Sequence, residues 1–393
     1  YMIPSQFVMI SSVPLTPNGK TDRHALKALV SPSPAEVKEF VSPRDVLELK
    51  LAQIWQEVLG VEPIGVNDDF FELGGHSLMA VRLMARIKEE LRYDVPLAAL
   101  IRGGNIDRLA KTIREGATAE SSLVALQTKG QRPPLFFVHP IGGNVLCYVD
   151  LARRLGNDQP FYGLQSAALN GDREPHTTIE AMAAEYVPAL VAVQPNGPYR
   201  LGAWSFGCVV ALEMACQLRK RGEEVELMAL IDGWAPGQGV NSKDLAKGED
   251  DFSLLLVFLA DLGKLSGNDT RIDRDDFRGV ASNDLLKSVF ADSKARGVLP
   301  SYIDLKQFTR LFQVFRCNRL AALNYKPECR WLPKRTIIFR ATEARGRLDN
   351  QSTLGWETLA SEPIAVYDVP GDHYSMLRKP NSQRLASTLA DFL

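Results

Sequence analysis

The stretch Tyr199–Cys216 reads YRLGAWSFGCVVALEMAC and decides how the rest of the chain is interpreted. Its apolar beginning, Tyr199–Trp204, is typical of a buried strand, and the apolar spacing after Gly207 predicts a helix. Ser205 then stands in a sharp turn, where small neighbours relieve crowding of the backbone. Gly207, two residues after the serine, is small. Ala203, two residues before it, stands where the strand–serine–helix motif GxSxG has its first glycine. The stretch predicts a nucleophilic serine at the end of a strand.

A serine hydroxyl needs a base, and a third group must orient that base. In the α/β-hydrolase arrangement the acid and then the histidine follow the serine along the chain. The chain has five histidines, of which four precede the serine: His24, His76, His139 and His176. The fifth, His373, lies in the segment PGDHYSML just beyond an apolar run. We therefore expect His373 to be the base.

Two strand ends offer an acid for the triad. Asp232 closes the apolar run Val225–Ile231, directly after the helix that follows the serine. Asp349 comes after a later strand, and Glu343 lies nearer to the end of that strand. Spacing alone leaves this choice open.

A tetrahedral intermediate needs backbone N–H groups aimed at its oxyanion. The N–H of Phe206, the residue after the nucleophile, is one expected donor. The other is expected from the loop after an earlier strand, Val138–Gly143, which reads VHPIGG. His139 in this loop is expected to hold the loop by hydrogen bonds and to take no direct part in the chemistry.

Short apolar runs alternate with helical patterns around the serine, which predicts a mostly parallel sheet covered by helices on both faces. Expected strands are Leu135–His139, Phe161–Leu164, Tyr199–Trp204, Val225–Ile231, Thr336–Thr342 and Ile364–Val369. Expected helices are Asn144–Leu155, Ile179–Val193, the helix after Ser205, and Ser382–Leu393. Residues 236–327 show only helical spacing, which indicates a lid over the site; a separate helical bundle is the alternative.

The part before this sheet has a different character. Residues 44–115 read as a small bundle of four helices, one of them short, with Ser42 expected to cap the first. Its second helix starts at Ser77, after the segment Asp68–Leu78, which reads DDFFELGGHSL. The N–H groups at a helix start favour a phosphate, so Ser77 is a candidate attachment site; an ordinary helix cap is the alternative.

Composition narrows the class further. The formal charge of −1 gives no basic field for nucleic acid or anionic membranes, and no apolar run is long enough to span a bilayer. The start lacks both the pattern of a signal peptide and an initiator Met, so we expect a piece of a longer chain. The five cysteines are scattered without metal spacing, which indicates free thiols, no metal site and a cytoplasmic location.

The C-terminal 270 residues resemble the type I thioesterases of nonribosomal peptide synthetases, through the motifs VHPxGG, WSFG, LID and GDH. The resemblance implies an α/β-hydrolase fold over residues 123–393. It also implies that Asp232, and not Asp349, is the acid, and that the N–H of Ile141 is the second oxyanion donor.

Residues 68–78 resemble the modification site of peptidyl carrier proteins, which implies that Ser77 carries a 4′-phosphopantetheine arm. Asn18–Arg23, NGKTDR, resembles the final motif of an adenylation domain, in which Lys20 would contact the adenylate. Residues 1–27 are then a remnant without adenylating activity of its own. Residues 28–43 and 116–122 have the composition of linkers.

Together these resemblances imply an enzyme that releases a carrier-bound peptidyl thioester. The acyl group would pass from the arm on Ser77 to Ser205 and leave by hydrolysis or macrocyclisation. The implied partners are upstream condensation and adenylation domains and a phosphopantetheinyl transferase. A generic serine esterase fused to a helical bundle, and a docking scaffold with an inactive hydrolase domain, are the alternatives.

Overall fold

A computed structural model describes residue 21 and residues 40–91, 93, 95, 97–114, 122–170, 173–238, 250–266, 274–277, 280, 282–296, 299, 303–343 and 353–393. Lys20 and the rest of its motif apart from Thr21, most of the two linkers, and Asp349 lie outside the described residues. Within those residues, no helix combines the length and the apolar composition needed to cross a bilayer.

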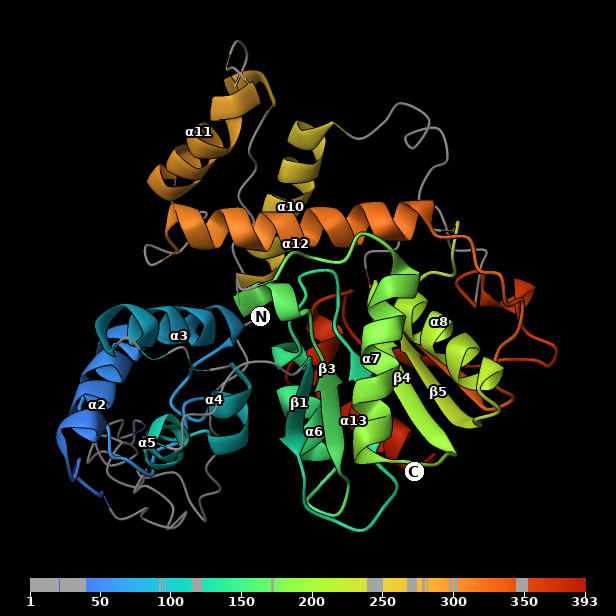
Figure 1. Ribbon diagram of the computed structural model, residues 1–393, viewed down its shortest axis with the longest axis horizontal. Coiled ribbons are helices and arrows are strands. Elements are labelled where there is room, and N and C mark those ends of the chain that lie inside the picture. Colours follow the sequence, from blue (N-terminus) through green and yellow to red (C-terminus); the bar gives the residue numbers. More distant parts are fainter. Residues whose placement is uncertain are drawn as a thin grey trace.

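The described residues of the first part form a helical domain beside one edge of a sheet (Figure 1). Its helices are α2 (Val46–Leu59), α3 (Ser77–Leu91), α4 (Leu97–Gly103) and α5 (Ile106–Arg114). The expected cap at Ser42 is wrong: Asp45 is the N-cap of α2 and accepts a hydrogen bond from the N–H of Glu48. An aspartate followed three residues later by a glutamate is itself a capping pattern, and it places the helix start after Pro43.

The helical domain has its own apolar core. Trp55 of α2 is fully buried and meets the ring of Phe70 edge-on, with 5.2 Å between the ring centroids. Phe70 belongs to the loop that leads into α3, so this contact fixes the loop against α2. Gly60 ends α2 in a left-handed conformation, with φ of 68°, as a C-terminal glycine commonly does.

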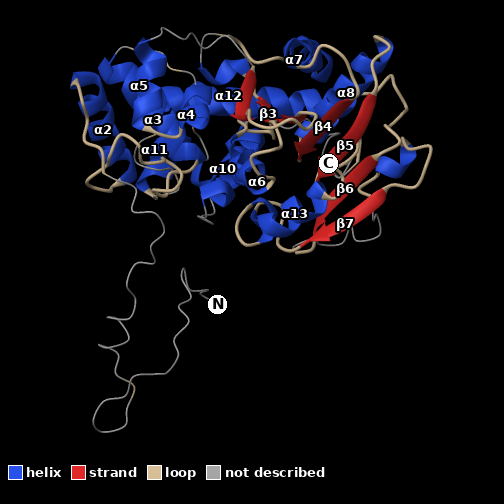
Figure 2. Cartoon of the chain, turned by 90° about the horizontal axis from the view of Figure 1, so that it is seen from below, coloured by secondary structure: helices blue, strands red, loops and turns tan. Residues whose placement is uncertain are grey.

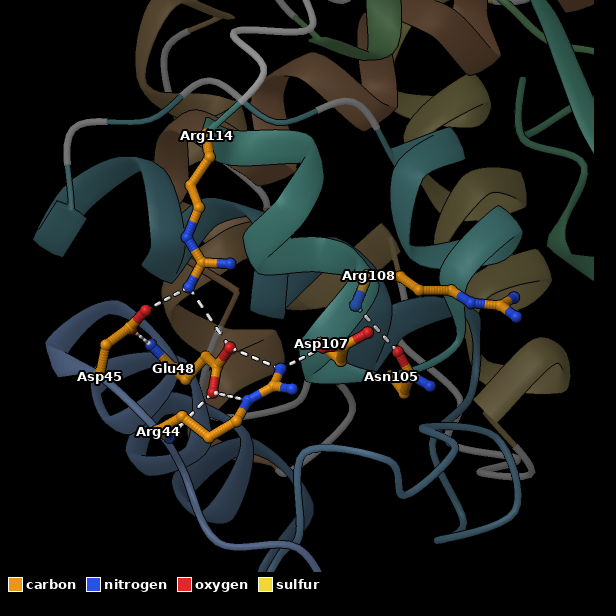
Figure 3. Close-up of polar contacts among 7 residues, drawn as sticks. All are labelled: Arg44, Asp45, Glu48, Asn105, Asp107, Arg108 and Arg114. Carbon is orange, nitrogen blue, oxygen red and sulfur yellow. Dashed lines mark hydrogen bonds and ion pairs between the residues drawn. The ribbon is translucent and has the colours of Figure 1, made fainter.

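A network of charged side chains ties the start of α2 to α5 (Figure 3). The Glu48 carboxylate is almost fully buried and lies between two guanidinium groups, 2.8 Å from Arg44 and 3.3 Å from Arg114. Arg44 also pairs with Asp107 of α5, and Arg114 pairs with Asp45. The hydrogen bonds from Arg44 hold the pKa of Glu48 down at about 2.

The second part contains a seven-stranded sheet in the order β1-β3-β2-β4-β5-β6-β7. The strands are β1 (Leu123–Gln127), β2 (Leu135–Val138), β3 (Phe161–Leu164), β4 (Tyr199–Trp204), β5 (Val225–Ile231), β6 (Thr336–Ala341) and β7 (Ala365–Val369). All neighbours are parallel except β1, which pairs antiparallel with β3. The parallel strands confirm the expected sheet, whereas the sequence analysis did not predict β1.

Helices cover both faces of this sheet (Figure 2). One face packs against α7 (Ile179–Val193) and α8 (Gly207–Lys220), and the other packs against α6 (Val149–Arg154) and α13 (Asn381–Ala390). Successive residues of β2 alternate between these two cores, as the pleat of a strand requires. The single helix expected over Asn144–Leu155 is instead a 3₁₀ turn, η1 (Leu146–Tyr148), that continues into α6.

Three further helices lie above the sheet in Figure 1: α10 (Asp251–Ser266), α11 (Ser282–Ala295) and α12 (Leu305–Asn324). They share an apolar core in which the Phe258 ring lies 5.3–5.6 Å from three phenylalanines of α12. The described residues between β5 and β6 contain helices and no strand, as the sequence analysis expected.

We predict that Glu48→Gln weakens the packing of α2 on α5. Loss of a buried, charge-assisted acceptor should cost about 1–3 kcal/mol. Because folding lowers the pKa of Glu48 below its ordinary value of 4.5, this stability is present above pH 4.5 and is lost as the pH falls towards about 2. Faster amide hydrogen exchange in α2 at pH 7, with a difference that shrinks at acid pH, is the expected result.

Glu328→Gln is the control, because Glu328 is 84% exposed and pairs only across the surface with Lys220. Equal exchange rates of α2 amides in the Glu48→Gln variant and the unaltered chain would contradict the prediction.

Candidate active site

Ser205 occupies a sharp turn between β4 and α8. Its φ is 59°, a left-handed conformation that a non-glycine residue rarely adopts, and its N–H donates to the carbonyl of Ile231 at 2.9 Å. A Cβ on Gly207 would lie 2.6 Å from the carbonyl oxygen of His139 and 2.7 Å from that of Val138. The turn therefore has no room for a side chain at position 207, whereas the Ala203 methyl is accommodated in the core.

The ring of His373 connects the serine to a carboxylate. Its Nε2 lies 3.0 Å from Ser205 Oγ, and its Nδ1 lies 2.7 Å from Asp232 Oδ2. The three residues come from the ends of β4, β5 and the loop after β7, so the sheet brings together side chains far apart in sequence. With the Nδ1 proton directed at the carboxylate, Nε2 can accept the proton of the serine hydroxyl.

Asp232 is held from more than one side. It is buried, its backbone has a φ of 46°, and its Oδ1 accepts a hydrogen bond from the N–H of Ala341 at 3.0 Å. Its own N–H donates to the carbonyl of Phe339 on β6 at 2.7 Å. These contacts fix the position of the carboxylate, whose Oδ2 lies against His373 Nδ1. Two other acids were alternatives for this role. The backbone N–H of Glu343 donates to the carbonyl of Gly371 at 2.9 Å, and Asp349 lies outside the described residues.

The loop after β2 lies beside the serine. Gly143 has a φ of 82°, and a Cβ there would lie 2.6 Å from Val314 of α12, which explains the need for glycine. The carbonyl of Ile141 accepts a hydrogen bond from Asn318 of α12 at 2.8 Å, so α12 fixes the orientation of this peptide. Phe206, on the other side, is the N-cap residue of α8.

His139 is fully buried and hydrogen-bonded at both ring nitrogens. Nδ1 donates to the carbonyl of Pro140 at 2.7 Å, and Nε2 accepts from the Tyr186 hydroxyl at 2.8 Å. Burial lowers the pKa of His139 to about 4, so the ring is neutral at pH 7. These contacts agree with the structural role expected from the sequence.

Several supporting residues were not identified from the sequence. The Tyr148 hydroxyl donates to the carbonyl of Val138 at 2.7 Å and accepts from the N–H of Trp204 at 2.9 Å, which joins β2 to β4 beside the serine. The Trp204 ring packs on His373 with 5.0 Å between centroids. The Tyr374 hydroxyl donates to Asp261 of α10 at 2.7 Å and so ties the histidine loop to the helices above. Nothing in the local sequence distinguishes these residues, because each contacts a residue from another part of the chain.

A cavity of about 590 Å³ connects the helical domain with the serine. Gly75 and His76 line it at the loop before α3, and Ser205 and His373 line it on the side of the sheet. Helix α3 begins at Ser77, so its first N–H groups are available for a phosphate attached there. A phosphorylated pantetheine arm fits this arrangement, because the space from the start of α3 to the serine is continuous.

The described residues offer little for other chemistries. Burial raises the pKa of the Cys208 thiol to about 12, so this cysteine beside the serine is a packing residue and not a second nucleophile. Among the side chains that the structure describes, no three His, Cys, Asp or Glu residues gather as a metal site would require.

The parallel sheet, the strained serine turn and the serine–histidine–aspartate series define the α/β-hydrolase class of serine enzymes. The family model described as "Thioesterase domain" matches residues 133–393, so the chain belongs to the thioesterase family. A second model, "Phosphopantetheine attachment site", matches residues 50–113, and the helical domain is therefore a carrier with a covalent 4′-phosphopantetheine. A carrier joined to such a thioesterase releases a carrier-bound peptide by hydrolysis or cyclisation.

The chain is also similar to two curated peptide synthases. The chain is 33% identical to chondramide synthase cmdD of Chondromyces crocatus over 99% of this chain and 10% of the relative. It is 40% identical to a dimodular nonribosomal peptide synthase of Bacillus subtilis over 66% of this chain and 11% of the relative. The chain thus spans about a tenth of the length of these two proteins.

Solved structures agree with the fold. The four-domain nonribosomal peptide synthetase holo-AB3403, bound to AMP and glycine, matches with a TM-score of 0.64 and 32% identity, over 100% of this chain and 29% of that one. The thioesterase domain Vlm2, bound with a dodecadepsipeptide, matches at 19% identity with a TM-score of 0.51, over 69% of this chain and 96% of that one, and this likeness concerns the fold alone. The chain is therefore similar to the carrier–thioesterase part of nonribosomal peptide synthetases.

We predict that Gly207→Ala disturbs the serine turn and that Ala203→Gly does not. A methyl group at position 207 meets two carbonyl oxygens and should cost about 1–3 kcal/mol of unfolding free energy as β2 and α8 move apart. Ala203→Gly should cost about 1 kcal/mol through backbone freedom but leave the turn intact. Labelling of Ser205 by a fluorophosphonate should slow at least tenfold only in the Gly207→Ala variant; equal slowing in both would contradict this account.

Proposed function

We propose that Ser205 is the nucleophile, His373 the general base and Asp232 the group that orients His373 in the release of a peptidyl thioester. The hydrogen-bonded series of these three residues, open to a cavity that begins at the carrier loop, supports the proposal. The backbone N–H groups of Ile141 and Phe206 are the proposed donors to the oxyanion. Water or an internal amine or hydroxyl of the peptide completes the release.

The first half-reaction forms an ester on Ser205. As Oγ attacks the thioester carbonyl, its proton passes to His373 Nε2, and the Asp232 carboxylate stabilises the imidazolium that results. The negative charge on the carbonyl oxygen is met by the two backbone donors. When the C–S bond breaks, His373 returns the proton to the leaving sulfur.

The second half-reaction releases the product. His373 takes a proton from water, or from an amine or hydroxyl of the peptide, as that group attacks the ester carbonyl. The C–O bond to Ser205 then breaks, and His373 returns the proton to Oγ. Water gives the free acid, and an internal nucleophile gives a ring.

Ser77 is the proposed attachment residue for the arm. The covalently bound phosphopantetheine supplies the thiol on which the peptide arrives as a thioester. The start of α3 at Ser77 and the glycines before it support this assignment, because the helix N–H groups favour the phosphate and the glycines leave space for a partner enzyme.

We propose the following division of the chain: an adenylation-domain remnant over 1–27, a linker over 28–43, a four-helix carrier over 44–115, a linker over 116–122 and the thioesterase over 123–393. Residues 236–327 are the proposed lid, supported by Phe258 and Leu311, which line the cavity from α10 and α12. Upstream condensation and adenylation domains, a phosphopantetheinyl transferase and a cytoplasmic location complete the proposal.

Ser205→Ala should abolish release, with a fall in rate of at least about a thousandfold. A fluorophosphonate should label the unaltered chain but not this variant, while Ser387→Ala, a change at an exposed serine of α13, should label normally. Mass spectrometry of intact protein measures both. Absence of labelling in the unaltered chain would favour a docking scaffold with an inactive hydrolase domain.

Ser77→Ala should remove the attachment site without harming the triad. A phosphopantetheinyl transferase should add the mass of one phosphopantetheine to the unaltered chain and none to the variant. The variant should still hydrolyse a free peptidyl thioester, because that substrate needs no arm. Addition of the mass to the Ser77→Ala variant would refute Ser77 as the site.

A further inference from the structure

The carrier touches the thioesterase through an arginine of α6. Arg153 Nη2 donates to both carboxylate oxygens of Asp69, at 2.9 and 3.0 Å, and its guanidinium lies 5.4 Å from the centroid of the Phe71 ring. Both carrier residues belong to the loop that leads into α3. One side chain therefore combines a charged hydrogen bond with a contact to an aromatic face.

The Asp69 carboxylate is fixed by its own loop before it meets the arginine. Its Oδ1 accepts the N–H groups of Phe71 and Glu72 at 2.9 and 3.1 Å. A Cβ on Gly104 of the carrier would lie 2.3 Å from Asp69 Oδ2, so glycine at that position leaves room for the carboxylate. The carrier thus presents an acceptor of set direction, and little side-chain entropy is lost when Arg153 binds it.

Apolar contacts extend around this ion pair. Leu146 of η1 is buried within the apolar core of the carrier, and Val149 of α6 packs against the same core. On the carrier side, Ile101 of α4 packs against both the carrier core and the core below the sheet. The segment from η1 to α6 is therefore the surface of the thioesterase on which the carrier sits.

The same segment is attached to the catalytic strands. Tyr148 in η1 joins the ends of β2 and β4, next to Ser205. Behind it, Asp150 of α6 accepts hydrogen bonds from Arg154 and from Ser382 of α13, both at 2.6 Å. A carrier held by α6 is thus held at a fixed place relative to the serine.

We propose that Arg153 is the residue by which the thioesterase recognises its carrier. Arg153 hydrogen-bonds Asp69 and stacks over the Phe71 ring. With the carrier bound in this way, the start of α3 faces the cavity that leads to Ser205. Asp69 is the second residue of the DDFFELGGHSL segment. The contact therefore depends on the charge of Asp69 and gives selectivity for a carrier with an acidic side chain at this position. This inference rests on the proposed function of Ser77 and Ser205.

The test compares two substrates in the full chain. One is an acyl group loaded on the carrier by a phosphopantetheinyl transferase, measured in a single turnover; the other is the same acyl group as a free N-acetylcysteamine thioester, which needs no carrier. We expect Arg153→Ala to lower the ratio of carrier-borne to free release about five- to tenfold. Asp69→Asn keeps the acceptor for the loop N–H groups but removes the charge, and it should lower the ratio similarly.

Coupling between the two residues is the sharper measurement. If they act on each other, the Arg153→Ala/Asp69→Asn double variant should be no slower than the slower single variant. Added salt should slow carrier-borne release in the unaltered chain but have little effect in Arg153→Ala, because the attraction that salt screens is already absent. Arg132→Ala is the matched control, since Arg132 is 47% exposed against 46% for Arg153 and pairs with Asp158 away from the carrier.

The outcomes separate this inference from the function on which it rests. An unchanged ratio in Arg153→Ala, or independent losses in the double variant, would overturn Arg153 as the recognition residue. Equal losses with both substrates would show that Arg153 only supports the fold, and that also overturns it. If Ser205→Ala releases both substrates as fast as the unaltered chain, the proposed function itself fails.

Discussion

The active-site turn depends on how closely α8 approaches the end of β2. Position 207 has backbone carbonyls of Val138 and His139 where a side chain would be, so the first turn of α8 rests directly on the strand. That contact holds Ser205 in its left-handed conformation, a strained state that persists only when the surrounding structure determines it. The neighbouring loop that carries Ile141 starts at the same two residues. Ser205 and this loop are therefore positioned by one contact.

The order of the strands in the sheet is the second constraint on the site, because it places Ser205 next to Asp232. β4 and β5 are adjacent, so the serine and the aspartate that end them are neighbours at one edge, as is usual for the carboxyl ends of parallel strands. The histidine comes from a loop after the last strand, and it needs support that the sheet alone does not give. Trp204 provides a ring beneath it, and Asp232 provides the hydrogen bond to Nδ1. Two rigid strand ends and one supported loop together form the hydrogen-bonded series of Ser205, His373 and Asp232.

Much of this could be predicted from the sequence, because the deciding signals are local. Strand β4 and helix α7 have the predicted bounds, since apolar periodicity and turn residues mark both ends. Chain order and resemblance pointed to Ser205, Asp232 and His373, since His373 is the only histidine after Ser205, and the structure places these three side chains in hydrogen-bond contact. Contacts across the sheet leave no local signal. The hydroxyl of Tyr148 bridges β2 and β4. Tyr148 lies in a 3₁₀ turn, so the helix that the sequence predicted from Asn144 begins only at Val149.

Strand β1 was missed because its burial is weak: Val124 is the one fully buried residue in an otherwise half-exposed edge strand. The start of α2 was misplaced because Ser42-Pro43 and Asp45 both fit the beginning of a helix, and the hydrogen bond to Glu48 decides between them. Figure 1 places α4 beside β1, and the two elements pack together. β1 is thus covered by a helix of the carrier, which the sequence pattern of the strand does not predict.

Residues 115–122 separate α5 from β1, and the shortness of this connection has a kinetic consequence. A short link gives the two parts that it joins an effective concentration of about a millimolar, so the carrier meets its own thioesterase far more often than any free partner does. A weak contact then suffices for high occupancy. It also dissociates quickly, so the carrier is released soon after each delivery. The small binding free energy of a half-exposed ion pair is therefore an advantage for turnover. Tighter binding would lengthen the time that the carrier stays on the thioesterase without improving the supply of substrate.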